Sequence, residues 1–105
     1  MTTILAGDIG GTNTRLAFVD ATPRGGRILF EKTFPSRVRT SLETALEEFL
    51  SLRSAAFTRA SFGIAGPVRN GRCEATNLPW VVDAKSVAKR LRLKRVGLSN
   101  DLVAN

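Results

Sequence analysis

Residues 5–20 read LAGDIGGTNTRLAFVD, and the rest of the chain can be interpreted around them. An apolar run carries the carboxylate of Asp8 to its carboxyl end, two adjacent glycines and a threonine follow, and a second apolar run begins at Leu16. Two such runs separated by a glycine turn are typical of antiparallel strands. We therefore predict a strand, a tight turn and a returning strand over this stretch.

The turn itself has a composition suited to binding anions. Gly10 and Gly11 lack Cβ atoms and permit positive φ, so that successive backbone N–H groups can converge on a phosphate. Thr12 adds a hydroxyl, and Asp8 could bind Mg²⁺, directly or through water, because hard cations take oxygen ligands. The spacing fits neither the dinucleotide fingerprint nor the Walker A loop. An ordinary hairpin, whose glycines only make the turn, remains the alternative.

Composition limits the chemistry that the chain can perform. The chain has 105 residues, of which 43% are hydrophobic and 24% charged, and this indicates one globular domain. Histidine is absent and Cys73 is the only cysteine, so neither a catalytic triad nor a zinc finger can form within it. No apolar run is long enough to span a membrane, and the start lacks the features of a secretory signal. We expect a cytoplasmic protein that uses carboxylates, amides and hydroxyls.

The net charge of +7 raises nucleic acid as a possible partner. However, apolar residues occur at helical spacing within the most basic segment, residues 85–95, which places Lys85, Lys89 and Arg90 on a solvated helix face. Aromatic residues for base stacking are sparse there. We therefore expect no nucleic-acid partner, and an acidic partner domain would also account for the charge.

Hydrophobic periodicity predicts the remaining elements. Three antiparallel strands are expected at 3–8, 14–20 and 27–34, with Ile28, Phe30, Lys32 and Phe34 sharing one face of the third. A helix should begin near Thr40 or Ser41, where Thr40 and Glu43 resemble a capping box, and Glu43 should face water. A fourth strand at 59–65 should run parallel to its predecessor, through a right-handed crossover. An extended piece at 71–77, a loop at 78–80, a helix at 84–91 capped by Asp83 and a strand at 95–99 complete the order.

Several blocks of the sequence resemble a known family. The run Asp8-Ile9-Gly10-Gly11-Thr12 resembles the first phosphate motif of the actin-like sugar kinases. The blocks FGIAGPV at 62–68, ATNLPW at 75–80 and Asn100-Asp101 resemble the bacterial glucokinase family in their order and approximate spacing. The resemblance implies an α/β, ribonuclease H-like (actin-like ATPase) lobe, with a mixed five-stranded sheet, antiparallel strands 1–3 and helices packed on it. It also implies that residues 1–105 form the amino-terminal small lobe of a two-lobe sugar kinase whose second lobe is absent from this chain.

The resemblance further implies the phosphorylation of glucose at its 6-hydroxyl, with ATP and Mg²⁺. The residues that would bind the ATP phosphates are Gly7, Asp8, Ile9, Gly10, Gly11 and Thr12, with Asp8 also meeting the metal. Asn100 and Asp101 would bind the sugar, and Asp101 would be the catalytic base. A second argument is independent of the resemblance: ligands of open α/β sheets bind outside the carboxyl ends of the strands. Since Asp8 ends the first predicted strand and Asp101 follows the last, we expect both to face one crevice. Asn77 and Trp80 would line the sugar side, or Trp80 would be part of the core.

Two other functions stay open. A ribonuclease H-like nuclease could gather carboxylates around two magnesium ions. A sugar sensor related to these kinases could keep the fold and act without catalysis. In the kinase interpretation the isolated chain should be inert and should self-associate through an apolar face, because a second lobe has to close over the substrates. The full-length enzyme is expected to be a homodimer with no membrane partner.

Overall fold

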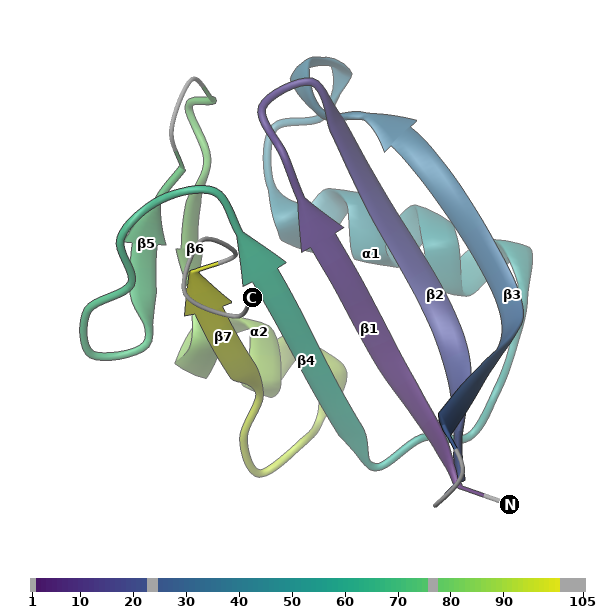
Figure 1. Ribbon diagram of the computed structural model, residues 1–105. Coiled ribbons are helices and arrows are strands. Elements are labelled where there is room, and N and C mark those ends of the chain that lie inside the picture. Colours follow the sequence, from purple (N-terminus) through teal and green to yellow (C-terminus); the bar gives the residue numbers. More distant parts are fainter. Residues whose placement is uncertain (1, 23–24, 76–77, 101–105) are drawn as a thin grey trace.

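The computed structural model describes residues 2–22, 25–75 and 78–100. Its main sheet has the strand order β3-β2-β1-β4-β7, in which β1, β2 and β3 are antiparallel and β4 and β7 run parallel to β1 (Figure 1). This confirms the predicted mixed five-stranded sheet. The elements, in chain order, are β1 (Thr3–Ile9), β2 (Asn13–Thr22), β3 (Gly25–Pro35), the 3₁₀ helix η1 (Ser36–Val38), α1 (Leu42–Leu52), β4 (Arg59–Ile64), β5 (Arg72–Glu74), β6 (Val81–Asp83), α2 (Ala84–Leu91) and β7 (Gly97–Asn100).

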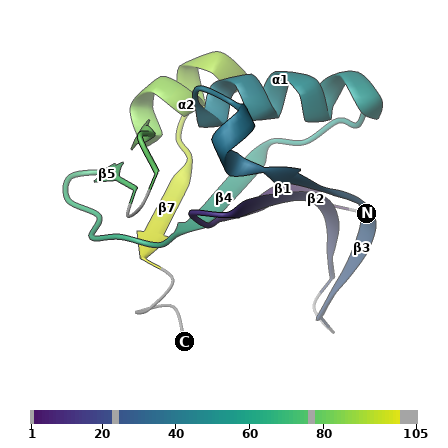
Figure 2. The same ribbon diagram turned by 90° about the horizontal axis from the view of Figure 1, so that it is seen from above.

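Both helices lie on one side of the main sheet (Figure 2). Because side chains alternate along a strand, one face of each strand packs under the helices. The core aromatic rings meet there: the Phe49 ring of α1 lies 5.0 Å from that of Phe18 and 5.4 Å from that of Phe30. Full burial of a ring such as that of Phe18 or Phe49 stabilises the fold by about 1.5–3 kcal/mol. The fully buried side chains include Leu5, Ile9, Leu16, Phe18, Phe34, Leu42, Phe49, Phe62 and Ile64.

Strand β3 departs from the predicted alternation. Phe18 pairs with Phe30 but Val19 pairs with Ile28, so Leu29 is an extra residue at a β-bulge. Leu29 and Phe30 both pack against the core, whereas Ile28 is 49% exposed. The prediction that Ile28 lies on the same face of the strand as Phe30 and Phe34 is therefore wrong. A bulge bends the strand and increases its twist, which ordinary alternation does not anticipate.

Helix α1 begins one residue later than the proposed capping box requires. Ser41 is the N-cap, and its hydroxyl accepts a hydrogen bond of 3.2 Å from the Thr44 amide. Glu43 makes no box with Thr40, because its carboxylate accepts a 3.2 Å bond from the Ser86 hydroxyl of α2. The prediction that Glu43 faces water is thus also wrong, since the side chain lies where the two helices meet.

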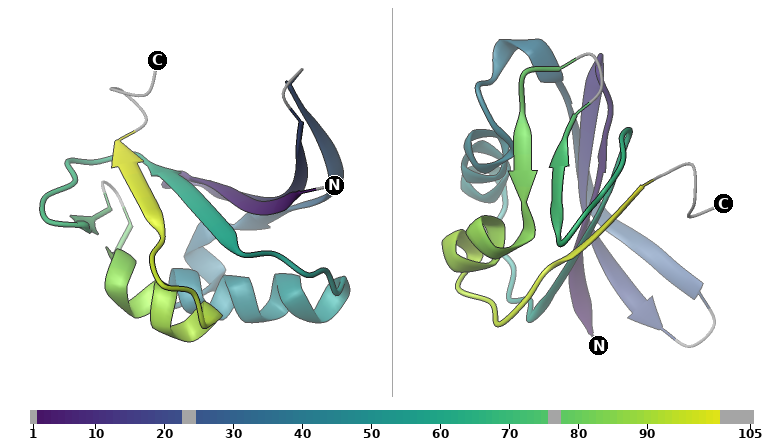
Figure 3. Two further views of the ribbon diagram at one scale, coloured as in Figure 1. Left: turned by 90° about the horizontal axis from the view of Figure 1, so that it is seen from below. Right: turned by 90° about the vertical axis from the view of Figure 1, so that its left-hand side faces the viewer.

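The segment after β4 forms a second, two-stranded sheet from β5 and β6, which lies beside α2 (Figure 3). Its strands follow a tight turn in which Asn70 (φ 53°) and Gly71 (φ 73°) are both left-handed. Asp83 ends β6 and caps α2 as predicted, accepting a 2.9 Å bond from the Lys85 amide. Lys85 and Lys89 are exposed as expected.

Candidate functional site

Three parallel strands end together at one edge of the main sheet. In the strand register Ile9 of β1 lies beside Ile64 of β4, which lies beside Asn100 of β7. The Ala65 amide also donates a 3.2 Å hydrogen bond to the Ile9 carbonyl. The turn after β1, the segment after β4 and the chain after β7 therefore start at the same edge, which is where open α/β sheets bind ligands.

The β1–β2 turn is closed by a 2.9 Å hydrogen bond from the Gly10 amide to the Asn13 carbonyl. Within the described residues, the glycines with positive φ are Gly66 and Gly71. Gly10 and Gly11 therefore do not use the positive φ that glycine permits. A Cβ atom at Gly10 would lie 3.0 Å from the Asn13 carbonyl oxygen, a tight contact that favours a small residue at this position.

Ser36, at the start of η1, holds this turn in place. Its hydroxyl donates a 2.7 Å hydrogen bond to the Gly10 carbonyl, and its amide donates a 2.9 Å bond to the Thr12 carbonyl. The Thr14 hydroxyl lies 2.8 Å from the Ser36 hydroxyl. The sequence interpretation missed Ser36, because nothing local in the run from Pro35 to Arg37 reveals a partner in a turn more than twenty residues earlier.

The residues before the turn divide between the core and the surface. Gly7 fits between the Phe62 ring and the Leu16 side chain, and a Cβ atom there would clash with the ring. Ile9 is 1% exposed. Both could meet a phosphate only through their backbone.

Asp8 is exposed, and its side chain is on the face of the sheet opposite to that of Gly7 and Ile9. Its neighbours on the adjacent strands are Arg15 of β2 and Gly63 of β4. The Arg15 guanidinium is engaged by Glu31, with the Arg15 Nε 2.8 Å from a carboxylate oxygen. Gly63 has no side chain, so this neighbour on β4 does not cover the Asp8 carboxylate. A carboxylate at the end of a strand, next to a turn of amides, fits a magnesium ion that also touches phosphate. No group of three His, Cys, Asp or Glu side chains suited to a metal occurs within residues 2–22, 25–75 and 78–100.

The predicted sugar-side residues are only partly described. Asn100 ends β7 at the shared edge and is partly buried. Asp101 and Asn77 lie outside the described residues. Trp80 is 1% exposed, and its indole Nε1 donates a 2.9 Å hydrogen bond to the Arg39 carbonyl. Of the two alternatives for Trp80, the structure favours the core.

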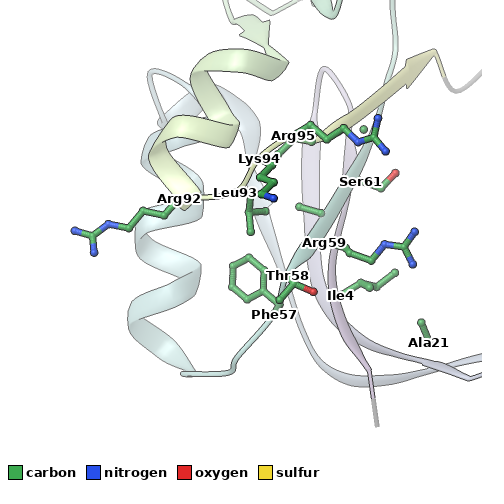
Figure 4. Close-up of a pocket in the computed structure, with 13 residues that line it drawn as sticks. Ile4, Ala21, Phe57, Thr58, Arg59, Ser61, Arg92, Leu93, Lys94 and Arg95 are labelled. Atoms are coloured by element: carbon green, nitrogen blue, oxygen red, sulfur yellow. The ribbon is translucent and has the colours of Figure 1, made fainter.

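A groove of about 880 Å³ lies at the opposite end of the sheet, at the amino ends of β4 and β7. Figure 4 shows the Arg59 and Arg95 side chains pointing the same way past Ser61, while Arg92 points away. This groove is far along the strands from the β1–β2 turn. The turn instead lies at the opposite, carboxyl edge of β1, and its residues are partly or fully exposed.

Comparisons with known proteins give matches in both sequence and fold. The family model described as Glucokinase matches residues 5–105. Glucokinase of Synechocystis sp. (strain PCC 6803) is 38% identical over 113 residues, which cover 95% of this chain and 31% of that protein. The crystal structure of glucokinase from an Antarctic psychrotroph matches with a TM-score of 0.88 at 31% identity, covering 99% of this chain and 34% of that one. A ROK family protein from Streptococcus pneumoniae TIGR4 matches with a TM-score of 0.70 at 25% identity, covering 95% of this chain and 35% of that one.

The fold is that of an actin-like ATPase lobe of the kind found in sugar kinases. Within this class, the chain belongs to the glucokinase family. It spans about a third of the length of the relatives that it matches (31% and 34%). Neither helix in the described part of the chain is long and apolar enough to cross a membrane.

Proposed function

We propose that this chain is the amino-terminal small lobe of a two-lobe glucokinase, which transfers the terminal phosphoryl group of ATP to the 6-hydroxyl of glucose. The observation that supports this most is the common edge at which β1, β4 and β7 end, because the glycine turn then lies at the same edge as the end of β7, with β4 between them. Membership of the glucokinase family favours a kinase over a nuclease or a sugar sensor.

The chain's own residues have separate tasks in this proposal. Backbone amides of Gly11 and Thr12 hold the phosphates, with Gly10 leaving room for them beside the turn that its own amide closes, and Asp8 holds Mg²⁺. Magnesium, when bound, neutralises charge that develops on the phosphoryl oxygens. Asn100 orients sugar hydroxyls through its donor and acceptor atoms. Asp101 accepts the proton of the 6-hydroxyl as that oxygen attacks phosphorus.

A second lobe is needed to complete the reaction. Phosphoryl transfer to a sugar requires the exclusion of water, which would otherwise accept the phosphoryl group. The β1–β2 turn is partly exposed at an open edge, so this lobe does not exclude water alone. The full-length enzyme is proposed to be a cytoplasmic homodimer, and the separate 105-residue chain to be inactive.

The test uses a protein extended to the full length of its relatives, assayed for ATP-dependent formation of glucose 6-phosphate. Asp101→Asn should lower kcat by about 10²–10⁴-fold, because the general base is lost, and should leave glucose binding largely intact. Asp83→Asn is the matched control: asparagine caps helices as well as aspartate does, so kcat should be unchanged. Unchanged kcat in Asp101→Asn would remove Asp101 from its role, and absence of glucose phosphorylation by the unmutated protein would refute the function.

A further inference from the structure

Thr14 and Ser36 are the buried polar side chains of the described residues, and both are 0% exposed. A buried hydroxyl is costly unless it is hydrogen-bonded. Thr14 bonds to Ser36, and Ser36 bonds to the β1–β2 turn. Both fully buried hydroxyl groups thus belong to one hydrogen-bond chain that ends at the β1–β2 turn. This is the turn that the family resemblance identifies as a phosphate site.

The donors and acceptors in this chain of bonds can be assigned. The Gly10 carbonyl can only accept, so the single Ser36 hydroxyl proton is donated to it. The Thr14 hydroxyl must then donate to the Ser36 oxygen. With the Ser36 amide donating to the Thr12 carbonyl, one residue fixes two carbonyl groups of the turn.

Fixing these carbonyls also fixes the amides that follow them. In a planar trans peptide the C=O bond and the next N–H bond point in opposite directions. Since the Gly10 carbonyl points toward buried Ser36, the Gly11 N–H points away from the core. Donors that are oriented before the ligand arrives bind a developing or resident negative charge most effectively.

We propose that Ser36 is a positioning residue for nucleotide binding, which aims the Gly11 amide at an ATP phosphate by holding the Gly10 and Thr12 carbonyls inward. The choice of ligand rests on the proposed glucokinase function. The orientation of the Gly11 amide does not, so the two can be tested separately.

The first test measures steady-state kinetics in the protein extended to full length. Ser36→Ala should raise the KM for ATP about tenfold, because the Gly10 carbonyl loses its partner and the turn relaxes, while the KM for glucose stays within about twofold. Thr14→Val is the matched control: it is equally buried and of similar shape, and it leaves the bond from Ser36 to Gly10 in place. It should lower thermal stability as Ser36→Ala does and change the KM for ATP less than about threefold. Equal increases in the KM for ATP in both variants, or parallel increases in both KM values of Ser36→Ala, would overturn the proposal.

The second test measures the amide chemical shifts and hydrogen exchange of the turn by NMR of the 105-residue chain, without any nucleotide. Ser36→Ala should shift the Gly11 and Thr12 amide resonances and speed their hydrogen exchange, while the amides of Cys73 and Val82 in the second sheet stay unchanged. An unchanged Gly11 amide refutes the positioning role. If Gly11 shifts and the full-length protein phosphorylates no glucose, the positioning of the turn is supported and the proposed function is refuted.

Discussion

The β1–β2 turn and the turn at residues 69–72 both contain glycine, and they are held in different ways. In the second turn Asn70 and Gly71 are left-handed, and Arg69 and Arg72 close it with mutual backbone bonds of 2.9 and 3.0 Å. This is the local geometry that an Asn-Gly pair favours. In the first turn the glycines are not left-handed, and Ser36 holds the loop from another element.

The difference separates two uses of glycine. At Gly71 the backbone conformation requires it, so a substitution should cost stability and nothing else. At Gly10 the requirement is space beside a carbonyl and access to backbone amides, so a substitution should affect ligand binding more than folding.

The largest effect is expected for Gly10→Val in the full-length protein. The new side chain would press on the Asn13 carbonyl and cover the turn's amides, so kcat/KM for ATP should fall on the order of 10²-fold. Gly71→Ala, assayed in parallel, should leave kcat/KM unchanged. If Gly10→Val keeps full activity, the turn is only a hairpin.

Gly7→Ala tests whether close packing excludes a side chain at Gly7, in the strand that leads into the first turn. Its Cβ would clash with the Phe62 ring, and overpacking of this kind costs about 1–3 kcal/mol of unfolding free energy. Urea denaturation of the chain measures this loss. Gly97→Ala is a milder control, since its Cβ would lie 3.2 Å from the exposed Ser61 hydroxyl oxygen. Equal stability of Gly7→Ala and the unmutated chain would contradict the close packing.

Gly71→Ala should lower the unfolding free energy by about 1–2 kcal/mol, because an L side chain is strained at φ 73°. Each kcal/mol corresponds to a fall in Tm of roughly 4–8 °C in a domain of this size. Thermal unfolding followed by circular dichroism is a sufficient measurement. A Tm within one degree of the unmutated value would show that the turn does not need glycine.

Arg92→Gly also tests the cost of a side chain at positive φ, but here the substitution should increase stability. Arg92 is left-handed (φ 59°) at the end of α2, where glycine is the usual residue. The substitution should raise the unfolding free energy by about 0.5–1 kcal/mol, since the relief of Cβ strain is partly offset by the entropy of glycine. Arg90→Gly, inside the same helix, should be destabilising. A loss of stability in Arg92→Gly would contradict this expectation.

The smallest effect concerns how the unfolding free energy depends on pH through Cys73, in the second sheet. Burial, and then the charge of Glu74, raise the pKa of the Cys73 thiol above its ordinary value of 9.0. Above that pH the unfolded chain loses the proton while the folded chain retains it, so stability should fall as the pH rises. Cys73→Ala should flatten this fall in urea titrations between about pH 8 and 10. An unchanged slope would exclude the thiol as its source.

Most of the main sheet and both α-helices could be predicted, because their apolar periodicity is strong and local. What sequence reasoning missed depends on tertiary contacts. The bulge at Leu29 and the placement of Glu43 against Ser86 follow from packing between elements. The turn before β5 was missed although its signal, the Asn70-Gly71 pair, was present in the sequence.

The site was predictable to a smaller extent. The resemblance marked Gly10, Gly11, Thr12 and Asp8, and the structure places all four at or beside one turn. It could not show that Gly7 and Ile9 pack into the core, nor that Ser36 anchors the turn, because neither follows from spacing along the chain. The roles of Asn100 and Asp101 remain predictions.

The central claim is that the β1–β2 turn binds the phosphates of ATP. Titration of the full-length protein with Mg²⁺-ATP, followed by amide NMR, tests it most directly. We predict saturable shifts at the Gly11 and Thr12 amides. The amides of Ser61, Lys94 and Gly97, in the groove at the amino ends of β4 and β7, should be unaffected. Shifts confined to that groove, with the turn unchanged, would contradict the account.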